Sequence, residues 1–322
     1  MKIAGIGSYL PRQILSAEAL DQRHDLPPGS VFRATGVQTR HYCASDEDQI
    51  SMGAAAAMAA LDDADVQVSD IDLVIAAQAV PYQPIPATAP AYMRALEMPP
   101  GQAFGLDLNS TCLSFLSAME HAAALLQQGR YRRALIVTSE VASRALPWPD
   151  KPQVAGLFGD GAAAMVLTDG GVLPVMRFAT YPAHYDACGI GAGGTRFDFH
   201  TAPADFAAHA MFDMEGKTLF RLTATHFVPF VDALLDDAGW HRDEIDLIIP
   251  HQASPAGLSH IVRQCGFDPA KVIDISRDKG NQIAASIPIA LAQVWPGLKP
   301  GAKLLFLGTS AGVSFGGAAV TL

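Results

Sequence analysis

The chain has 322 residues, of which half are hydrophobic and 17% are charged, and its formal net charge is -10. This length predicts roughly two domains' worth of folded chain with a large buried core. The acidic balance and the lack of any Lys/Arg-rich run argue against a nucleic acid or an anionic membrane as a direct partner.

The N-terminal and cysteine patterns are those of a cytoplasmic protein. The N-terminus, MKIAGIGSYLP, has too short an apolar run and too weak a basic region for a secretory signal. Apolar stretches such as GAAAAMAAL fall short of the roughly 18 residues that span a bilayer. The four cysteines, Cys43, Cys112, Cys188 and Cys265, are scattered without a CxxC pair. We therefore expect a reducing cytoplasm, with neither a disulfide framework nor a zinc site.

A segment near residue 70 is repeated in the second half of the chain. Residues 60–79, ALDDADVQVSDIDLVIAAQA, align without a gap to LLDDAGWHRDEIDLIIPHQA at 234–253, with 10 of 20 positions identical. Both copies have the pattern of a helix end, a polar turn and a short apolar strand. Many α/β proteins contain such units, but the pattern alone does not require identity across the turn. An internal duplication is therefore favoured, in which His251 is an addition at the position equivalent to Ala77.

The segments after each copy repeat in the same order. A predicted helix face precedes the strand ALIVTSEV at 134–141, and a similar face precedes the strand LLFLGTSA at 304–311. We predict an α/β protein of two similar halves, residues 1–168 and 169–322, with sheets covered by helices. The two helix faces are Leu113, Leu116, Met119, Ala123 and Leu126 in the first half, and Ile283, Ile287, Ala290 and Val294 in the second.

Cys112 lies in DLNSTCLSFLSAMEHAAALL, where a predicted strand gives way to a helix that Ser110 or Thr111 could cap. A thiol at a helix N-terminus has its pKa lowered by the helix dipole, which makes a nucleophilic thiolate available. Taken alone, a cysteine at a buried strand–helix junction is more often a small core residue. Cys112 becomes a candidate nucleophile only in combination with other residues.

Two further polar residues occupy comparable positions in the second half. His251 lies at the C-terminal end of an apolar strand, where α/β proteins bind ligands. Asn281, in DKGNQIAASIPIAL, lies at the start of the helix that corresponds to the Cys112 helix. Alone, the first would be a structural histidine and the second a helix cap. Their joint placement with Cys112 favours one site at the seam between the halves.

These residues and their surroundings resemble the thiolase-fold condensing enzymes, and most closely β-ketoacyl-acyl-carrier-protein synthase III. The resemblance covers nearly the whole chain and rests on the order and spacing of its motifs. They are GIGSYLP at the N-terminus, ATGVQTRH at 34–41, STC at 110–112, SEVASR at 139–144, FGDGAAAMVL at 158–167, AGGTR at 192–196, PHQA at 250–253, GNQIAASIP at 280–288 and the C-terminal GTSAGVSFGGAAVTL.

The resemblance implies an α/β fold of the thiolase type, a five-layered α-β-α-β-α sandwich of two duplicated halves, usually a homodimer. It implies that Cys112 is acylated by a thioester, with the backbone N–H groups of Cys112 and Ala311 as the oxyanion hole. His251 and Asn281 would hold the carbonyl of malonyl carrier protein and stabilise the enolate formed as carbon dioxide leaves. The substrates would be coenzyme A or phosphopantetheine thioesters, from acyl-CoA or acyl carrier protein, and no metal or redox cofactor is implied.

Related activities differ at a few positions. A degradative thiolase would carry a second cysteine in the C-terminal loop, where this chain has Ser-Ala-Gly at 310–312, and a papain-type hydrolase would resemble CGSCW. A non-catalytic partner subunit of a heterodimer usually lacks the reactive cysteine. An acyltransferase that passes the acyl group to an alcohol or amine stays open as an alternative, because it needs Cys112 and His251 but not the enolate-stabilising role of Asn281.

The positions that bind coenzyme A in typical members of the family differ here. We therefore expect intact chemistry with an altered carrier-binding rim. This favours a specialised condensing enzyme of fatty acid or polyketide biosynthesis, for a secondary metabolite or a dedicated acyl chain, over the housekeeping initiator of fatty acid synthesis. The sequence leaves open the acyl group and its donor. Ser30 and Ala34 replace a Trp and an Arg, Ala256 replaces an Arg, and Asp150-Lys151 replaces Asp-Arg-Gly, which leaves Phe32, Arg33, Lys151 and Arg263 as candidate substrate-binding residues.

Overall fold

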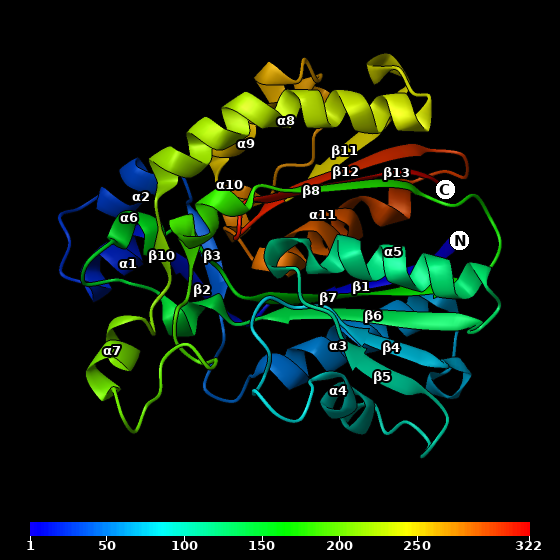
Figure 1. The fold of residues 1–322 in the computed structure, drawn as a ribbon, viewed down its shortest axis with the longest axis horizontal. Helices are drawn as coiled ribbons and strands as arrows, with labels where there is room; N and C mark the ends of the chain where they lie inside the picture. Colours follow the sequence, from blue (N-terminus) through cyan, green and yellow to red (C-terminus); the bar gives the residue numbers. More distant parts are fainter.

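The computed structural model describes all residues, 1–322, in a stack in which three layers of helices alternate with two β-sheets (Figure 1). These layers are the ones that the sequence pattern predicts. A strand with a continuous apolar run must be buried on both faces, and helices on each side of the sheet bury it. The five-layered α-β-α-β-α sandwich expected from the sequence is therefore present.

The first sheet is built only from residues between 2 and 168, in the strand order β1-β7-β6-β4-β5. β4 is parallel to β5 and β6, whereas β7 is antiparallel to β1 and β6. Its strands are β1 (Lys2–Tyr9), β4 (Leu73–Ala76), β5 (Phe104–Asp107), β6 (Arg133–Glu140) and β7 (Gly161–Thr168), and α3 (Gln49–Ala64) and α4 (Ala89–Ala95) cover its outer face.

The second sheet has the strand order β11-β12-β13-β8. β11 is parallel to β12, and β13 is antiparallel to both of its neighbours. Its strands are β8 (Val175–Thr180), β11 (Leu247–Pro250), β12 (Lys303–Ser310) and β13 (Ser314–Thr321), and α8 (Gly216–Ala238) and α9 (Pro255–Gln264) cover its outer face.

The central layer consists of α5 (Ser114–Gln127) and α11 (Ser286–Val294), which lie between the two sheets (Figure 1). A cluster of 30 buried apolar residues fills this layer and takes members from both halves, such as Leu116 from α5 and Ile287 from α11. Each large apolar side chain in it contributes about 1.5–3 kcal/mol by leaving water. The two halves therefore share one interior.

Equivalent backbone hydrogen bonds confirm the internal repeat. Just after β4, the N–H of Ala77 donates to the carbonyl of Val137 at 2.8 Å, and just after β11 the N–H of His251 donates to the carbonyl of Leu307 at 2.7 Å. Two members of the predicted helix faces lie outside the helices: Leu113 and Ile283 are in the 3₁₀ turns before α5 and α11, and Ile283 also packs against a separate cluster. The division of the chain at residues 168 and 169 stays a prediction.

Shorter elements gather at one end of the sandwich (Figure 1). None of the helices is both long and apolar enough to span a membrane. These elements are β2 (Gln13–Ser16), α1 (Ala17–Arg23), α2 (Ser30–Thr35), β3 (Thr39–Tyr42), α6 (Pro152–Ala155), β9 (Cys188–Gly189), α7 (Pro203–Ala208), β10 (Asp213–Met214) and α10 (Ser276–Lys279). Further 3₁₀ turns along the chain are Val68–Asp70, Thr111–Leu113, Ala142–Ala145, Pro182–Ala187, Arg242–Glu244, Pro269–Lys271, Ile283–Ala285 and Trp295–Gly297.

Candidate active site

Cys112 lies in a 3₁₀ turn between β5 and α5. The residue before it, Thr111, has a φ of 51°, a left-handed conformation that is unfavourable for a β-branched side chain. Asn109 holds this conformation, because its Oδ1 accepts a hydrogen bond from the N–H of Thr111 at 2.8 Å. Strained backbone of this kind clusters at functional sites. The thiol is thus presented by a turn that a side chain fixes in place.

The second half contains the same turn. The Oδ1 of Asn281 accepts a hydrogen bond from the N–H of Ile283 at 2.8 Å, and Ile283 has a φ of 52°. Asn281 therefore corresponds to Asn109, and Cys112 corresponds to Ala284, so the two candidate residues lie in equivalent turns but three positions apart. The shared spacing of Asn and Ser, at 109–114 and at 281–286, is the sequence signal that marks this equivalence.

The prediction that Ser110 or Thr111 caps α5 is wrong. The N-cap residue is Leu113, and no side chain caps the helix. Instead the hydroxyls of Thr111 and Ser310 are hydrogen-bonded to each other, and the Ser110 carbonyl, 2.8 Å from each of them, accepts from the hydroxyl whose proton is left free. These bonds hold the end of β12, and with it Ala311, against the nucleophile turn.

The Cys112 thiol keeps its proton in the resting protein. The residue is half-buried, and desolvation of its sulfur raises the pKa of the thiol to about 12. The backbone N–H groups of Ala311 and of Cys112 itself lie close to the sulfur and lower the pKa, but the effect of burial is larger. The predicted lowering of this pKa is therefore wrong for the resting protein.

His251 follows β11 directly and is only 7% exposed. Burial lowers the pKa of its imidazole to about 4, so the ring is neutral at physiological pH. Its Nδ1 has no hydrogen-bond partner within the protein. Gly308 of β12 makes room for it: a Cβ there would lie 2.8 Å from the Leu113 side chain and 3.5 Å from the Cβ of His251. His251 and the residue after Cys112 therefore flank the same glycine.

Asn281 is anchored through its backbone and is 6% exposed. Its N–H donates to the carbonyl of Leu157 at 2.8 Å, and its carbonyl accepts from the N–H of Gly159 at 3.0 Å. The side-chain Nδ2 donates to the carbonyl of Ala253 at 3.4 Å, a long bond that leaves the second amide proton free. Because Ala253 lies two residues after His251, this contact joins the PHQA and GNQ segments.

Glu140, at the end of β6, is a further buried group at this seam. The motif SEVASR contains it, but an acidic residue at the end of an apolar strand does not by itself mark a functional position. The side chain is fully buried, and its Oε1 accepts a hydrogen bond from the N–H of Ala79 at 2.6 Å. Burial raises the pKa of the carboxyl to about 8, while the N–H groups of Ala79 and Ala284 act in the opposite direction. The carboxyl therefore links a loop of each half.

An apolar cavity of about 210 Å³ lies beside Glu140. Hydrophobic residues make up 10 of the 14 that line it. They come from both halves and include Val80, Phe158, Phe212 and Ile283. Its mostly hydrophobic lining is that of a small-molecule site for an apolar group.

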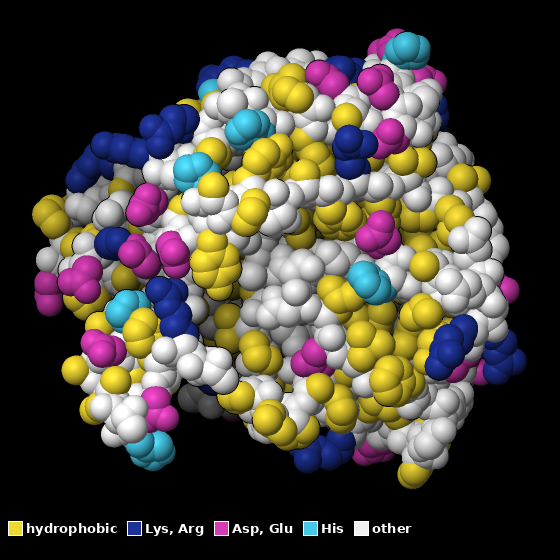
Figure 2. All heavy atoms as spheres, in the orientation of Figure 1, with side chains coloured by type: hydrophobic (Ala, Val, Ile, Leu, Met, Phe, Trp, Pro, Cys, Tyr) yellow, Lys and Arg dark blue, Asp and Glu magenta, His cyan; other side chains and the backbone are white.

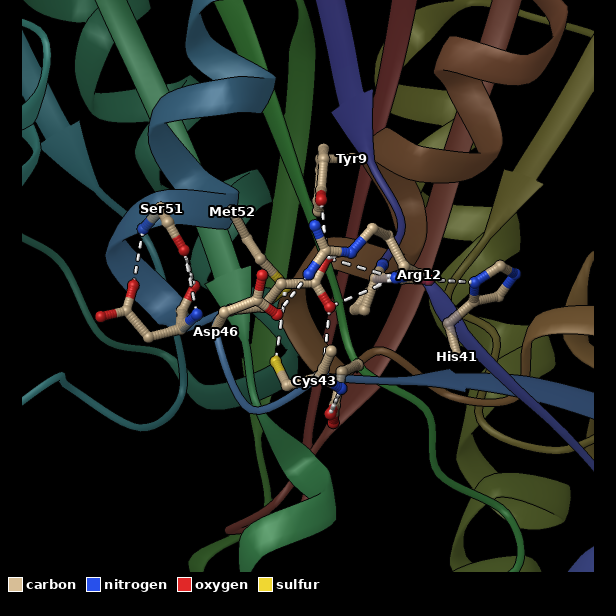
Figure 3. Close-up of polar contacts among 12 residues, drawn as sticks. Tyr9, Arg12, His41, Cys43, Asp46, Ser51 and Met52 are labelled. Atoms are coloured by element: carbon tan, nitrogen blue, oxygen red, sulfur yellow. Dashed lines mark hydrogen bonds and ion pairs between the residues drawn. The ribbon is translucent and has the colours of Figure 1, made fainter.

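The four cysteines differ in their surroundings. The Sγ of Cys43 is directed at the Sδ of Met52, at 3.6 Å, as Figure 3 shows. Cys265 belongs to an apolar cluster under α9. Cys188 of β9 lies close enough to Cys112 to contribute to the raised pKa of its thiol, although less than burial does. Cys188 is therefore a second thiol near the candidate nucleophile.

The four predicted substrate-binding residues are exposed, except for Lys151, which is partly exposed. Figure 2 shows that Lys and Arg side chains gather over α2 and the N-terminal end of α8. Phe32 is 40% exposed, and the neighbouring Arg33 donates to a backbone carbonyl five residues earlier in the chain at 3.0 Å. Lys151 forms a salt bridge with Asp213. Arg263 is exposed in the last turn of α9 and forms no salt bridge. None of the four is hydrogen-bonded to the candidate catalytic residues.

Comparison with known proteins identifies the family. The family model for 3-oxoacyl-[acyl-carrier-protein] synthase III matches residues 106–180. The model for the C-terminal part of the same family matches residues 235–322. The β-ketoacyl-[acyl-carrier-protein] synthase III of Rhodospirillum rubrum is 33% identical over 330 residues, which cover 99% of this chain and 98% of the relative. The same enzyme of Neisseria gonorrhoeae is 32% identical, over 98% of this chain and 97% of the relative.

Solved structures agree in fold. The chain superposes on the 3-oxoacyl-(acyl carrier protein) synthase III of Pseudomonas aeruginosa with a TM-score of 0.87 and 29% identity, covering 99% of this chain and 97% of the other. A priming β-ketosynthase from a polyketide biosynthetic pathway gives a TM-score of 0.90 and 26% identity, over 100% and 96% of the two chains. The chain therefore belongs to the 3-oxoacyl-[acyl-carrier-protein] synthase III family, the acyl-transferring condensing enzymes with the thiolase fold.

Proposed function

We propose that Cys112 takes an acyl group from a thioester and that the acyl-enzyme then condenses with malonyl carrier protein. The observation that carries this proposal is the meeting of three segments at one seam. The Cys112 turn, the PHQA segment with His251 and the turn of Asn281 are joined by Gly308 and by the contact between Asn281 and PHQA, beside an apolar cavity.

In the acylation step, the neutral His251 ring takes the thiol proton as the Cys112 sulfur attacks the thioester carbonyl. The N–H groups of Cys112 and Ala311, which already lie close to the sulfur, stabilise the oxyanion. The oxyanion collapses and expels the carrier thiolate, which recovers the proton. The apolar cavity holds the acyl chain.

In the condensation step, the bond between the malonyl carboxylate and its α-carbon breaks, carbon dioxide leaves, and the electron pair forms a thioester enolate. The ring N–H of His251 and the free amide proton of Asn281 stabilise the enolate oxygen. The enolate carbon attacks the acyl carbonyl, the tetrahedral oxyanion collapses, and Cys112 leaves as a thiolate that takes up a proton from water. Coenzyme A or phosphopantetheine thioesters are the substrates, and no metal or redox cofactor takes part.

We further propose a specialised role in the cytoplasm, in fatty acid or polyketide biosynthesis. Ser30, Ala34 and Ala256 cannot supply the stacking and guanidinium contacts that typical members use for coenzyme A. Arg33 and Lys151 are already bonded within the protein, whereas Arg263 is free to pair with an acidic carrier protein. The likeness to a priming β-ketosynthase supports this assignment.

We also propose that two chains pair along β5.

Mass spectrometry of the acylated protein tests the proposal. The protein is mixed with the same acyl group on coenzyme A and on carrier protein, and peptide mapping locates the added mass. We expect acyl mass on Cys112, formed faster from the carrier protein, and a β-ketoacyl product once malonyl carrier protein is added. Acyl mass on Cys188 in the wild-type protein, with none on Cys112, would contradict the assignment of the nucleophile. Transfer to an added alcohol or amine without condensation would show the alternative acyltransferase.

A further inference from the structure

A second cavity, of about 150 Å³, adjoins the same turn, Ala142–Ala145, as the proposed acyl cavity beside Glu140. Its walls come from β2, β3, the C-terminal end of α1 and the turn Ala142–Ala145. Unlike the acyl cavity, most of its lining side chains carry polar groups, among them those of Arg23, Tyr42 and Ser143. Nothing in the condensation chemistry uses these groups.

Tyr42 lines this cavity and carries a hydroxyl without a hydrogen-bond partner. The residue is 6% exposed, and its hydroxyl has no hydrogen-bond partner within the protein. A buried hydroxyl is destabilising unless it is paired, because it has given up its bonds to water. A ligand that accepts a hydrogen bond from Tyr42 would satisfy the group.

The charges around the cavity favour an anion. Arg23 lines it, is exposed, and forms no salt bridge. Arg40 lies fully buried on the same side of β3 as Tyr42, and its Nε and Nη1 have no partner within the protein. Asp160, a buried carboxylate near Tyr42, already accepts three hydrogen bonds, two from Ser143 and one from the N–H of Cys43. Arg23 and Arg40 thus both lie near Tyr42, and the buried carboxylate near Tyr42 has its acceptor sites largely used.

Asp21, near Arg40, is also committed, since it accepts hydrogen bonds from the N–H groups of Gly29 and Val31 at 2.6 and 2.9 Å. Glu18, also near Arg40, is exposed to water, which screens its charge. Asp21 and Glu18 therefore leave the positive charge of Arg40 largely uncompensated.

A flat wall of the cavity would suit a planar ligand. His24 and Trp148 stack on each other with ring centroids 4.1 Å apart and an interplanar angle of 7°, and both line the cavity. Burial, and then the charge of Arg23, lower the pKa of His24, so this wall is neutral. A cavity of about 150 Å³ holds a molecule of the size of benzene.

We propose that this cavity binds a small aromatic carboxylate, whose carboxylate group pairs with Arg23 and accepts a hydrogen bond from Tyr42 while its ring lies along Trp148. The site binds and does not react, since the Cys43 thiol on its wall is directed at Met52 (Figure 3).

Binding there should affect acylation, because the two cavities share a wall. Within the turn Ala142–Ala145, Ser143 faces the second cavity, whereas Ala142 and Arg144 line the acyl cavity. A ligand against Ser143 therefore presses on the backbone that shapes the acyl site. This part of the inference rests on the proposed use of the acyl cavity.

Calorimetric titration of the full chain with benzoate tests the binding, with benzyl alcohol as a neutral probe of the same shape and inorganic phosphate as a compact anion. We expect one benzoate per chain, at least about tenfold weaker binding of benzyl alcohol, and about tenfold weaker benzoate binding by Tyr42→Phe and by Arg23→Gln. Tyr42→Phe removes only the hydroxyl and keeps the ring that packs. Tyr185→Phe, at an exposed tyrosine outside the cavity, is the matched control and should bind as the wild type does.

The titration is repeated on protein whose Cys112 carries an acyl group, so that binding in the acyl cavity is blocked. Retained benzoate binding supports the second site, and loss of binding overturns it. The absence of benzoate binding to the wild type, equal binding by Tyr42→Phe, or binding of phosphate alone would also overturn it. Benzoate should change the rate of Cys112 acylation in the wild type but not in Tyr42→Phe. An unchanged rate in the wild type, with binding intact, overturns the coupling alone and leaves the proposed condensation untouched.

Discussion

Cys112 and His251 are both uncharged before substrate arrives. Burial raises the pKa of the thiol to about 12 and lowers that of the imidazole to about 4, so a preformed thiolate–imidazolium pair is strongly disfavoured. The Cys112 proton therefore passes to His251 while the sulfur attacks the thioester. During this attack the developing negative charge moves from the sulfur to the carbonyl oxygen. This keeps the thiol unreactive toward other electrophiles while no substrate is bound.

Replacing His251 should change how stability depends on pH. The folded protein holds this ring at a pKa of about 4, below its ordinary value of 6.5, so the unfolded chain takes up a proton first as the pH falls. The stability due to His251 is present above pH 6.5 and is lost as the pH falls toward 4. We expect the Tm of the wild type to fall over this window and that of His251→Asn to fall less. Parallel curves from calorimetry of the two proteins would contradict this.

Glu140 should make the stability of the fold depend on pH in the opposite direction to His251. Its folded pKa of about 8 lies above the ordinary 4.5, so its contribution to stability is fully present below pH 4.5 and is lost as the pH rises through 8. Glu140→Gln keeps an oxygen to accept from Ala79 but cannot ionise. We expect the free energy of unfolding of Glu140→Gln, relative to the wild type, to improve steadily across this window in denaturant titrations. A difference that does not vary with pH would show that Glu140 is ionised in the folded protein.

At the scale of residues, the sequence indicated the candidates but not their environments. Cys112, His251 and Asn281 could be found because a strand end or helix start is visible in the local pattern. The raised pKa of Cys112 could not, because it depends on desolvation by segments that are distant in the chain. Glu140 was missed for the same reason, since only the fold shows that a loop from each half closes over it.

At the scale of elements, the repeated helix–turn–strand unit was predictable because its hydrophobic period and its turn are local. The two strained turns were harder, because NSTC and NQIA share only the asparagine. Ser110 and Thr111 resemble helix caps in sequence, but in the fold they bind Ser310, which is about 200 residues away along the chain. Local propensity was thus overridden by a contact between the halves.

The matched turns provide a control for the role of Asn281. Asn109 and Asn281 each accept from the N–H two residues later at 2.8 Å, so the alanine variant of either should lose about 1 kcal/mol of stability. Only Asn281→Ala should also lose condensation, by about a hundredfold or more, while Cys112 is still acylated.

Single-turnover condensation, measured from preformed acyl-enzyme, separates the two effects. Asn109→Ala should lose less of the condensation rate than Asn281→Ala once it is acylated, because Asn109 holds the Cys112 turn but donates no hydrogen bond to the enolate. Normal condensation by Asn281→Ala would instead favour the acyltransferase alternative. Equal losses in both variants would mean that Asn281 acts only by holding its turn.

At the scale of the whole molecule, one sheet edge is apolar and open. β5 is the edge strand of the first sheet, and its Phe104 is 58% exposed. The nearby segment 81–87 is exposed throughout, with Ile85 87% exposed. Open apolar edges tend to pair with another chain. This feature supports the proposed homodimer.

Phe104→Asp should therefore shift the protein from dimer to monomer, because it places a charge on the edge that would be buried. Phe199→Asp is the control, since Phe199 is 59% exposed but lies outside the sheet, between β9 and α7. Light scattering after size-exclusion chromatography measures the mass of each variant. A monomeric wild type, or a Phe104→Asp variant that stays dimeric, would contradict pairing along β5.

The interior shared by α5 and α11 has a consequence for any attempt to divide the chain. Cut between Thr168 and Val175, the protein would give two fragments, each with one face of a sheet and one helix stripped of the surface they pack against. One fragment would carry the nucleophile and the other the imidazole, so neither could act alone even if it stayed in solution. Activity should return only when both are produced together and associate. The two pieces depend on each other twice, once to fold and once to react.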